Sequence, residues 1–477
     1  MIRALCGLLL VVASLGGNAT ARADGERPLT EADVVASVAQ HHPRLLVEAS
    51  RVAVAAAEVR AARGAFDPQL AIRADGQLTG YYDYGRMEVM LEQTTPYGGL
   101  AVFGGYRFDR GTLPSYYGLW DTLELGEVRA GVRMPLLRDL RIDDARGNRA
   151  RTGYEEEAAQ LMQRSVALQL VRDARLAYRR WVAAGSSLAV AESLLELARS
   201  RDAQVRRLAD EGAVASIEAV ENQRALLQRE ARRIAAEQRL GQAAVMLSLF
   251  LRDEEGLPRV PGRAELPPEA GAPPSGLPTA DEAYALAVAN RPEVARYDVL
   301  IERARLQERL ARNGRLPRLD VRATVSRDLG GAVSSSQEQR LAGTIVEGNV
   351  QLLSPIPNRT GSARVEARAA EIDGIEAERR FFLEQLRAEV ERALLDAAAA
   401  EASIGIERQA ASVAETLAAA EMRRFETGAT SLLIVNLREQ AAADARISVV
   451  EREAEVFAAR AVLEAVIGQL PASYSDP

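Results

Sequence analysis

Apolar side chains recur with two different spacings along the chain, and each change of spacing marks a new element. Thr30 and Thr279 each precede a short segment of helical period and have an acidic residue three positions later. This is the pattern of a capping box at a helix start. His42-Pro43 and Arg291-Pro292 end these helices and allow second, longer helices to begin. The pattern therefore predicts two helices at the start of each half.

A two-residue period follows in each half. Past a proline, apolar residues alternate with charged ones over residues 70–75 and again over residues 319–323. This period is the mark of a half-buried strand and also of a strand in a membrane barrel. A partner strand is expected later in each half, ending near Pro135 and near Pro355.

The longest predicted elements come next. Residues 147–208 and 361–425 contain no proline and are rich in Ala, Leu, Glu and Arg, a composition that favours long helices. Each segment ends in a glycine-centred turn, at Gly212 and Gly428, and a return helix follows. The sequence thus predicts one long helical hairpin in each half.

The two halves are copies of one plan. Thr30 matches Thr279, and His42-Pro43 matches Arg291-Pro292, both at an interval of 249 residues. A repeat of this length is too long for a solenoid and indicates a duplicated structural unit. The expected organisation is a cleaved signal peptide, a first repeat, a Pro/Gly-rich linker, a second repeat and a tail, at residues 1–23, 24–252, 253–277, 278–470 and 471–477.

The start of the chain reads as an export signal. Arg3 is followed by an apolar stretch to Leu15 and by Ala21-Arg22-Ala23, which fits the small-x-small cleavage rule. The alternative, a membrane anchor, needs a longer apolar run of ~20 residues. Cys6, the single cysteine, lies inside this segment, so we expect a mature protein without disulfides and without a lipid anchor. No later apolar run approaches spanning length, so membrane entry would require strands in a closed barrel.

Aromatic residues cluster in one region. Ten of the 22 aromatic residues lie between Tyr81 and Trp120. Such a cluster beside alternating strands suits a membrane–water girdle, although a cross-strand ladder on a soluble sheet is the alternative. The candidate interface residues are Tyr81, Tyr82, Tyr97, Tyr106, Tyr116, Tyr117 and Trp120.

Composition argues against several other functions. The net charge is -7 with no basic run, so nothing indicates a nucleic-acid partner. The two histidines, His41 and His42, are adjacent at a helix end, where neighbouring side chains point apart, and we expect both to be solvated. There is no phosphate-binding loop and no serine elbow. The sequence therefore predicts no catalytic residue, no metal site and no cofactor.

The order of these parts resembles that of the TolC-like outer membrane factors over nearly all of the mature chain. The resemblance rests on the paired openings, the strands after each proline and the turn motifs Arg207-Leu208…Gly212…Ser216 and Arg424-Phe425…Gly428…Ser431. It implies a mainly α fold with a β-barrel portion: a homotrimer with helical hairpins in a periplasmic α-barrel and four strands per protomer in a twelve-stranded barrel. It also implies an exit duct of a tripartite efflux pump or type I secretion system in the outer membrane of a Gram-negative bacterium, docking on a periplasmic adaptor and indirectly on an inner membrane transporter.

The resemblance further implies where partners meet the chain. The two hairpin turns would contact the adaptor through Leu208, Gly212, Ala213, Val214, Ser216, Phe425, Gly428, Thr430, Ser431 and Leu432. Members of the family often carry an acid six positions after the second turn glycine, where this chain has Ile434, whereas the first turn keeps Glu218. We therefore expect a periplasmic constriction built from Glu218, Glu221 and Ile434, with an apolar component that can gate by dewetting.

Two questions stay open from the sequence. The stretch from Ala74 to Pro135 is long for one loop, and residues 87–91 and 100–108 could form an additional hairpin inside or outside the barrel wall. The alternative function is a periplasmic coiled-coil scaffold or adaptor without a pore, which would share the signal and the hairpins but would not need two strand regions. The sequence does not specify the cargo.

Overall fold

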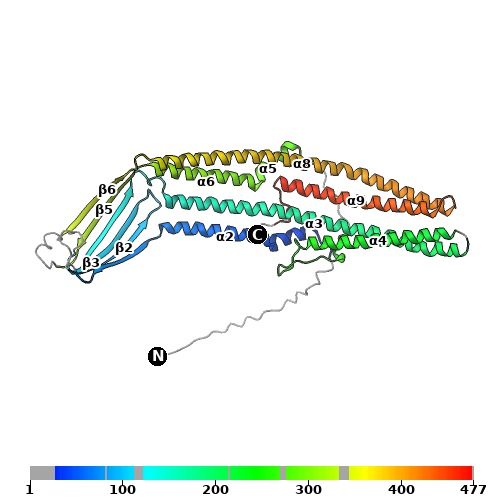
Figure 1. The fold of residues 1–477 in the computed structure, drawn as a ribbon, viewed down its shortest axis with the longest axis horizontal. Coiled ribbons are helices and arrows are strands. Elements are labelled where there is room, and N and C mark those ends of the chain that lie inside the picture. Colours follow the sequence, from blue (N-terminus) through cyan, green and yellow to red (C-terminus); the bar gives the residue numbers. More distant parts are fainter. Residues whose placement is uncertain are drawn as a thin grey trace, which may run out of the picture. The chain divides into compact units, whose positions relative to one another are not determined.

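The computed structural model describes residues 27–80, 83–111, 122–212, 215–268, 276–331 and 343–474 (Figure 1). It divides into two compact units, and each unit contains parts of both repeats. We call them the sheet unit, comprising Val38–Asp173, Pro274–Ala402 and Val456–Pro477, and the tip unit, comprising Met1–Ser37, Ala174–Pro273 and Ser403–Glu455. The predicted signal peptide lies outside the described residues.

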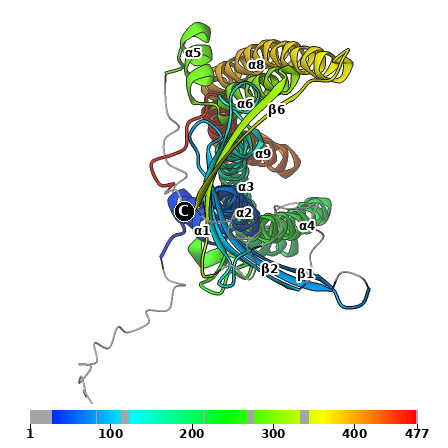
Figure 2. The same ribbon diagram turned by 90° about the vertical axis from the view of Figure 1, so that its left-hand side faces the viewer.

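The sheet unit contains one antiparallel sheet of six strands. In chain order the strands are β1 Gln69–Gln77, β2 Tyr84–Thr94, β3 Ala101–Gly111, β4 Glu127–Pro135, β5 Arg318–Asp328 and β6 Thr344–Leu353. Their order in the sheet is the same as their order in the chain. Figure 2 shows that the sheet is curved and twisted rather than flat.

The strand count corrects the expectation of four strands per protomer. The additional hairpin left open by the sequence is β2–β3, and it lies inside the sheet, between β1 and β4. Alternation is weak there because glycines interrupt it, as at Gly104-Gly105. This interruption is why the sequence alone did not place the hairpin.

Helices leave the sheet at one end, where β1 and β5 begin and β4 and β6 end. They are α2 Pro43–Arg63, α3 Asp144–Asp210, α6 Pro292–Arg315 and α8 Arg359–Glu426. The unit also contains α5 Ala280–Asn290, which precedes α6, and the end of α9 Leu432–Val466. The Thr279 hydroxyl and the Glu282 carboxylate form the predicted capping box of α5. The helical core of this unit is made of small and aliphatic side chains, including Ala287, Val390 and Leu463.

The tip unit packs the remaining parts of α3, α8 and α9 with α4 Ser216–Leu247 and most of α1 Glu31–His41. Trp181, Leu188, Leu195 and Leu247 are fully buried. The Tyr178 hydroxyl donates a hydrogen bond to the Leu29 carbonyl at 2.9 Å. Burial raises the pKa of Tyr178 to about 12.

The described part of the linker lies against α3 in the tip unit. It forms a single 3-10 turn, η3 Arg263–Glu265, and Arg263 makes two hydrogen bonds to the Glu192 carboxylate at 2.7 and 2.5 Å. These hydrogen bonds, opposed by partial burial, lower the pKa of Glu192. A Cβ at Gly185 would come within 2.6 Å of Leu266. The linker thus interrupts the helical structure as predicted, and its described part packs against α3.

His42 is buried rather than solvated, and its Nδ1 accepts a hydrogen bond from the Arg44 backbone N–H at 3.2 Å, which caps α2. Among the described residues, one helix is apolar enough by length and composition to cross a membrane, and it is α3. This is weak evidence for a span, because α3 also supplies core residues such as Trp181 and Leu188.

Candidate functional site

The six-stranded sheet has one apolar face. Residues paired across antiparallel strands point to the same side. The row Leu70, Leu91, Gly104, Ala130, Val325 and Val346 crosses all six strands and contains no polar side chain. Its outer members are open to solvent in the single subunit, with Leu70 65% and Val346 73% exposed. A continuous exposed apolar face of this kind requires a lipid or protein partner.

The opposite face of the sheet is charged. The row Arg73, Glu88, Arg107, Glu127 and Asp328 crosses five strands and alternates in sign over its first four members. Arg107 and Glu127 form an ion pair at 2.7 Å, and both are largely buried. Opposite charges placed directly across strands stabilise their pairing. An apolar face backed by a charged face is the pattern of a membrane barrel strand.

The chain covers part of the charged face at the end of the sheet far from the helices. Thr122 and Leu123 are buried, and the Leu123 backbone N–H donates to an Asp328 carboxylate oxygen at 3.1 Å. The Thr122 hydroxyl accepts a hydrogen bond from the Asp109 backbone N–H at 3.4 Å. The described part of the connection into β4 therefore lies over charged side chains.

The predicted interface aromatics are only partly described. Tyr97 is 80% exposed in the turn between β2 and β3, at the end of the sheet from which the helices leave. Tyr106 is on the apolar face, and its hydroxyl donates to the Leu125 carbonyl at 2.5 Å. These two residues lie at different levels of the sheet. Tyr81, Tyr82, Tyr116, Tyr117 and Trp120 lie outside the described residues.

The two helical turns of the tip unit share one backbone geometry. Gly212 and Gly428 both have φ +72°, a left-handed conformation that suits glycine. The Gly212 N–H donates to the Ala209 carbonyl at 3.1 Å, and the Gly428 N–H donates to the Phe425 carbonyl at 2.9 Å. Both turns are therefore closed by a backbone hydrogen bond between residues three positions apart. Each glycine is exposed, with open space where a Cβ would stand.

The predicted adaptor-contact residues differ in exposure. Leu208, Gly212, Ser216 and Gly428 are exposed, whereas Phe425, Thr430 and Ser431 are half-buried. Leu432 is fully buried and packs with Val205 and Val435 in a small core. Its side chain therefore joins helices instead of facing outward, and Leu433 is the exposed apolar neighbour. Ala213 and Val214 lie outside the described residues.

The three predicted constriction residues have distinct surroundings. Glu218 is half-buried in the first turn of α4, and its Oε2 has no hydrogen-bond partner. Glu221 forms an ion pair with Arg224 on the same helix, at 3.5 Å. Ile434 is exposed on α9. Among the described residues, no hydrogen bond or ion pair joins these three, so a constriction from them would need further copies of the chain.

A buried polar cluster that the sequence did not predict links three helices of the tip unit. It consists of Arg201 on α3, Arg229 on α4, and Asn436 and Glu439 on α9, and we call it the Arg201–Glu439 cluster. The Glu439 carboxylate accepts hydrogen bonds from Arg201 at 2.8 Å and from Arg229 at 2.9 Å. The Asn436 amide oxygen accepts from Arg229 at 3.2 Å. All four residues are nine-tenths or more buried.

The charges in this cluster depend on one another. Burial raises the pKa of Glu439, but hydrogen bonds and charge from Arg201 and then Arg229 outweigh burial, so the pKa lies below its usual value. Burial lowers the pKa of Arg229, and Glu439 partly offsets this. Each of the four residues by itself reads as a solvated helix residue, so no local sequence signal marked the cluster. The cluster ties the second hairpin to both helices of the first.

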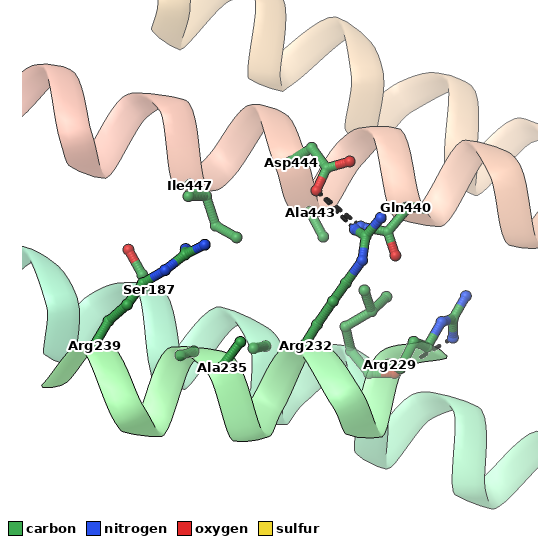
Figure 3. A pocket seen from close by; sticks show the side chains of 12 residues that line it. Ser187, Arg229, Arg232, Ala235, Arg239, Gln440, Ala443, Asp444 and Ile447 are labelled. Atoms are coloured by element: carbon green, nitrogen blue, oxygen red, sulfur yellow. Dashed lines mark hydrogen bonds and ion pairs between the residues drawn. The ribbon is translucent and has the colours of Figure 1, made fainter. Parts of the chain in front are cut away.

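A cavity of about 270 Å³ lies beside the cluster, between α3, α4 and α9 (Figure 3). Arg232 and Asp444 form an ion pair at 3.0 Å along its edge, and Gln440 donates to the same carboxylate oxygen at 2.8 Å. Both members of the ion pair are half exposed. The α4–α9 contact thus contains one buried ion pair, between Arg229 and Glu439, and one solvent-exposed ion pair, between Arg232 and Asp444. Among the described residues, no group of three acidic, His or Cys side chains could hold a metal ion.

Comparison with known proteins identifies the second repeat. The family model for outer membrane efflux proteins matches residues 283–469. This part of the chain is therefore similar to outer membrane efflux proteins. The matched residues include strands β5 and β6 and the second helical hairpin, which consists of α8, the turn at Gly428 and α9. No curated protein sequence matches the chain.

Solved structures extend the likeness to the first repeat. A Pseudomonas aeruginosa membrane protein has a TM-score of 0.64 at 16% identity, over 93% of this chain and 94% of that one. The Vibrio cholerae outer membrane protein VceC has 0.63 at 14%, over 92% and 96%. The open state of the Neisseria gonorrhoeae outer membrane channel MtrE has 0.62 at 13%, over 92% and 89%. The resemblance to the TolC-like outer membrane factors is confirmed at the level of the fold, which the chain shares with these outer membrane proteins over nearly its whole length.

Proposed function

We propose that this protein is an outer membrane channel that serves as the passive exit duct of a tripartite efflux pump or a type I secretion system. The observation that carries the proposal is the sheet, whose paired rows are apolar on one face and charged on the other. In a membrane, the apolar face meets lipid and the charged face lines water. The efflux protein domain supports the same reading.

The channel is an assembly of several copies. Six strands are too few for a barrel, since membrane barrels begin at eight, and open sheet edges are not stable in lipid. A homotrimer supplies the missing strands, as the family resemblance implies. The helices that leave one end of the sheet then extend on the periplasmic side, and the far end of the sheet faces outward.

The two helical turns are the surface that docks on a periplasmic adaptor. Gly212 and Gly428 present two turns of matching geometry, and exposed residues flank each of them. Leu208 and Ser216 flank the first turn, and Leu433 and Ile434 follow the second. Leu432 does not contact the adaptor itself. It is buried against Val205 and Val435, and this packing fixes the position of the docking surface. An inner membrane transporter is reached through the adaptor.

The Arg201–Glu439 cluster holds the channel entrance closed. Two arginines on the first hairpin share one carboxylate on the second, so the hairpins cannot separate without exposing three charged groups from a buried site. Opening requires a partner that offsets this cost, and an adaptor bound at the nearby turns is in a position to do so. The constriction residues Glu218, Glu221 and Ile434 would then move apart with their helices.

Docking is tested by a charge at the turn surface. We expect Leu433→Arg to abolish cross-linking to the adaptor and to lower export by the intact pump, because a charge replaces an exposed apolar contact. Leu417→Arg, on exposed α8 surface away from the turn, is the matched control and keeps both. Equal loss in the two variants, or normal export by Leu433→Arg, would refute docking at this surface.

Fractionation separates the channel from the alternative, a periplasmic coiled-coil scaffold. A channel appears in detergent extracts of the outer membrane, whereas a scaffold is released by osmotic shock. The exposed apolar row of the sheet favours the channel, since a soluble scaffold would leave it in water. Recovery of the folded protein in the shock fraction would overturn the proposal.

A further inference from the structure

The β2–β3 hairpin is bonded to strands on both sides of it. β1 pairs with β2 along its whole length, from Gln69↔Glu92 to Gln77↔Tyr84, and β3 pairs with β4 from Ala101↔Arg133 to Arg107↔Glu127. A surface loop has no reason to keep two continuous ladders. The hairpin is therefore a structural part of the sheet.

Ion pairs on the charged face reinforce this position. Glu88 on β2 is 4.0 Å from Arg73 on β1 and 3.6 Å from Arg129 on β4. Arg133 on β4 reaches Glu92 on β2 at 2.8 Å. The Glu92–Arg133 pair crosses β3 at the level of Ala101 and Phe103. The Glu88–Arg129 pair crosses it beside Gly105, which lies opposite Arg129 and has no side chain, and a Cβ there would lie 2.3 Å from the Val89 carbonyl oxygen. The glycine of β3 thus allows β2 and β4 to interact directly.

The edges of the sheet suit a second copy of this chain. Because the number of strands is even and every neighbour is antiparallel, β6 of one copy runs antiparallel to β1 of the next. Both edge strands carry the alternation of the interior strands, with Leu70 and Ile72 on β1 and Val346 and Val350 on β6 exposed on the apolar face. Joining these edges continues both faces without a break.

We propose that the hairpin widens the pore, so that three copies joined β6 to β1 form a barrel of eighteen strands rather than twelve. This rests on the proposed function and on its homotrimer. Strands ~4.8 Å apart and tilted by ~40° give a backbone diameter of ~36 Å for eighteen strands and ~24 Å for twelve. Side chains occupy a similar thickness in both walls, so the open cross-section more than doubles. Barrels of this strand number enclose an aqueous channel.

The wider lumen sets the class of cargo. Extended peptide or oligosaccharide chains, with their hydration, fit a lumen of this size at the level of the membrane, in addition to small molecules. Thr122 and Leu123 lie over the charged face at the outer end of the sheet.

A cysteine on the lumen face measures the width. Asn349 and Val350 are adjacent, exposed residues of β6 on the charged and the apolar face, and the only native cysteine, Cys6, is replaced by Ser throughout. Maleimide polymers with diameters from ~5 to ~25 Å, a range that brackets the two lumens, are applied to intact cells. We expect Asn349→Cys to react with polymers about twice as wide in the full chain as in a variant lacking Tyr84–Gly111, which keeps antiparallel order.

The outcomes separate the inference from the function it rests on. The same size limit in the two proteins overturns the widening. Rapid labelling of Val350→Cys by the smallest water-soluble maleimide shows that its face does not meet lipid, and this overturns the channel itself. If the shortened variant fails to fold, electron-microscopy density of the full trimer decides instead. A backbone wall ~36 Å across supports eighteen strands, and one ~24 Å across refutes them.

Discussion

Neutralising Glu439 should open the channel, because it is the single acid between two buried arginines. The Glu439 carboxylate is 9% exposed, and the Arg201 and Arg229 side chains are 5% and 2% exposed. Glu439→Gln keeps the shape but leaves both guanidinium groups without a counter-charge. Removing one partner of a buried ion pair costs about 3–5 kcal/mol. Applied to the contact between hairpins, 3 kcal/mol changes the ratio of open to closed states by about 150-fold.

The matched control lies on the same pair of helices. Asp444 on α9 pairs with Arg232 on α4 at 3.0 Å, but the two side chains are 56% and 51% exposed. Exposed pairs contribute about 0–1 kcal/mol. Asp444→Asn should therefore leave the channel closed. The comparison removes general effects of losing an acid from the α4–α9 contact.

Uptake of a bulky hydrophilic dye by intact cells measures the opening. We expect Glu439→Gln cells to admit the dye without a cognate pump, and Asp444→Asn cells to exclude it as the unchanged protein does. Both proteins must be present at equal amounts in the outer membrane. Dye exclusion by Glu439→Gln, or equal leakage through both variants, would refute the role of the cluster as a closure.

Acid should act in the same direction as this substitution. Because the folded pKa of Glu439 lies below the ordinary carboxyl value of 4.5, its contribution is complete above that value and is lost as pH falls through the folded pKa. Opening of the unchanged protein should therefore begin below about pH 4.5. Glu439→Gln is expected to be open at every pH, so it should show no such pH response. A pH response of the same size in the variant would assign it to another group.

Three further outcomes test separate parts of the account. Gly428→Val should lower the melting temperature of the tip unit, by about 1–2 kcal/mol of stability, because φ +72° strains any residue with a Cβ; an unchanged melt would contradict this. Val350→Arg should reduce membrane assembly, at a cost of about 2–4 kcal/mol at mid-membrane, while Asn349→Arg should assemble normally; equal trimer yields would place neither face in lipid. Tyr178→Phe should lose about 1 kcal/mol at neutral pH. The unchanged protein should in addition lose stability between pH 10 and 12, because its folded-state pKa of about 12 exceeds the ordinary 10.0, and the variant should lack this loss in alkaline melting curves.

Local signals made the helices and their ends predictable. Thr279 and Glu282 form the expected box, Pro43 and Pro292 start helices at the expected places, and Gly212 and Gly428 both close turns. These features depend on residues close in sequence, so one sequence contains the needed information. The duplication added the order of the elements, and with it the fold that the solved structures share.

Non-local pairing was harder to predict. The β2–β3 hairpin depends on partners in β1 and β4. Its glycines weaken the local alternation, and Gly105 leaves room for the ion pair between Glu88 and Arg129. The Arg201–Glu439 cluster joins residues more than 200 positions apart, and each of its members alone reads as a solvated helix residue. Leu432 shows the same limit, since only packing reveals that it faces inward.

Ion conduction by the purified protein in a planar lipid bilayer tests the channel most directly. The account predicts discrete current steps that are rare for the unchanged protein and frequent for Glu439→Gln. A folded, bilayer-inserted Glu439→Gln preparation that never conducts would contradict it.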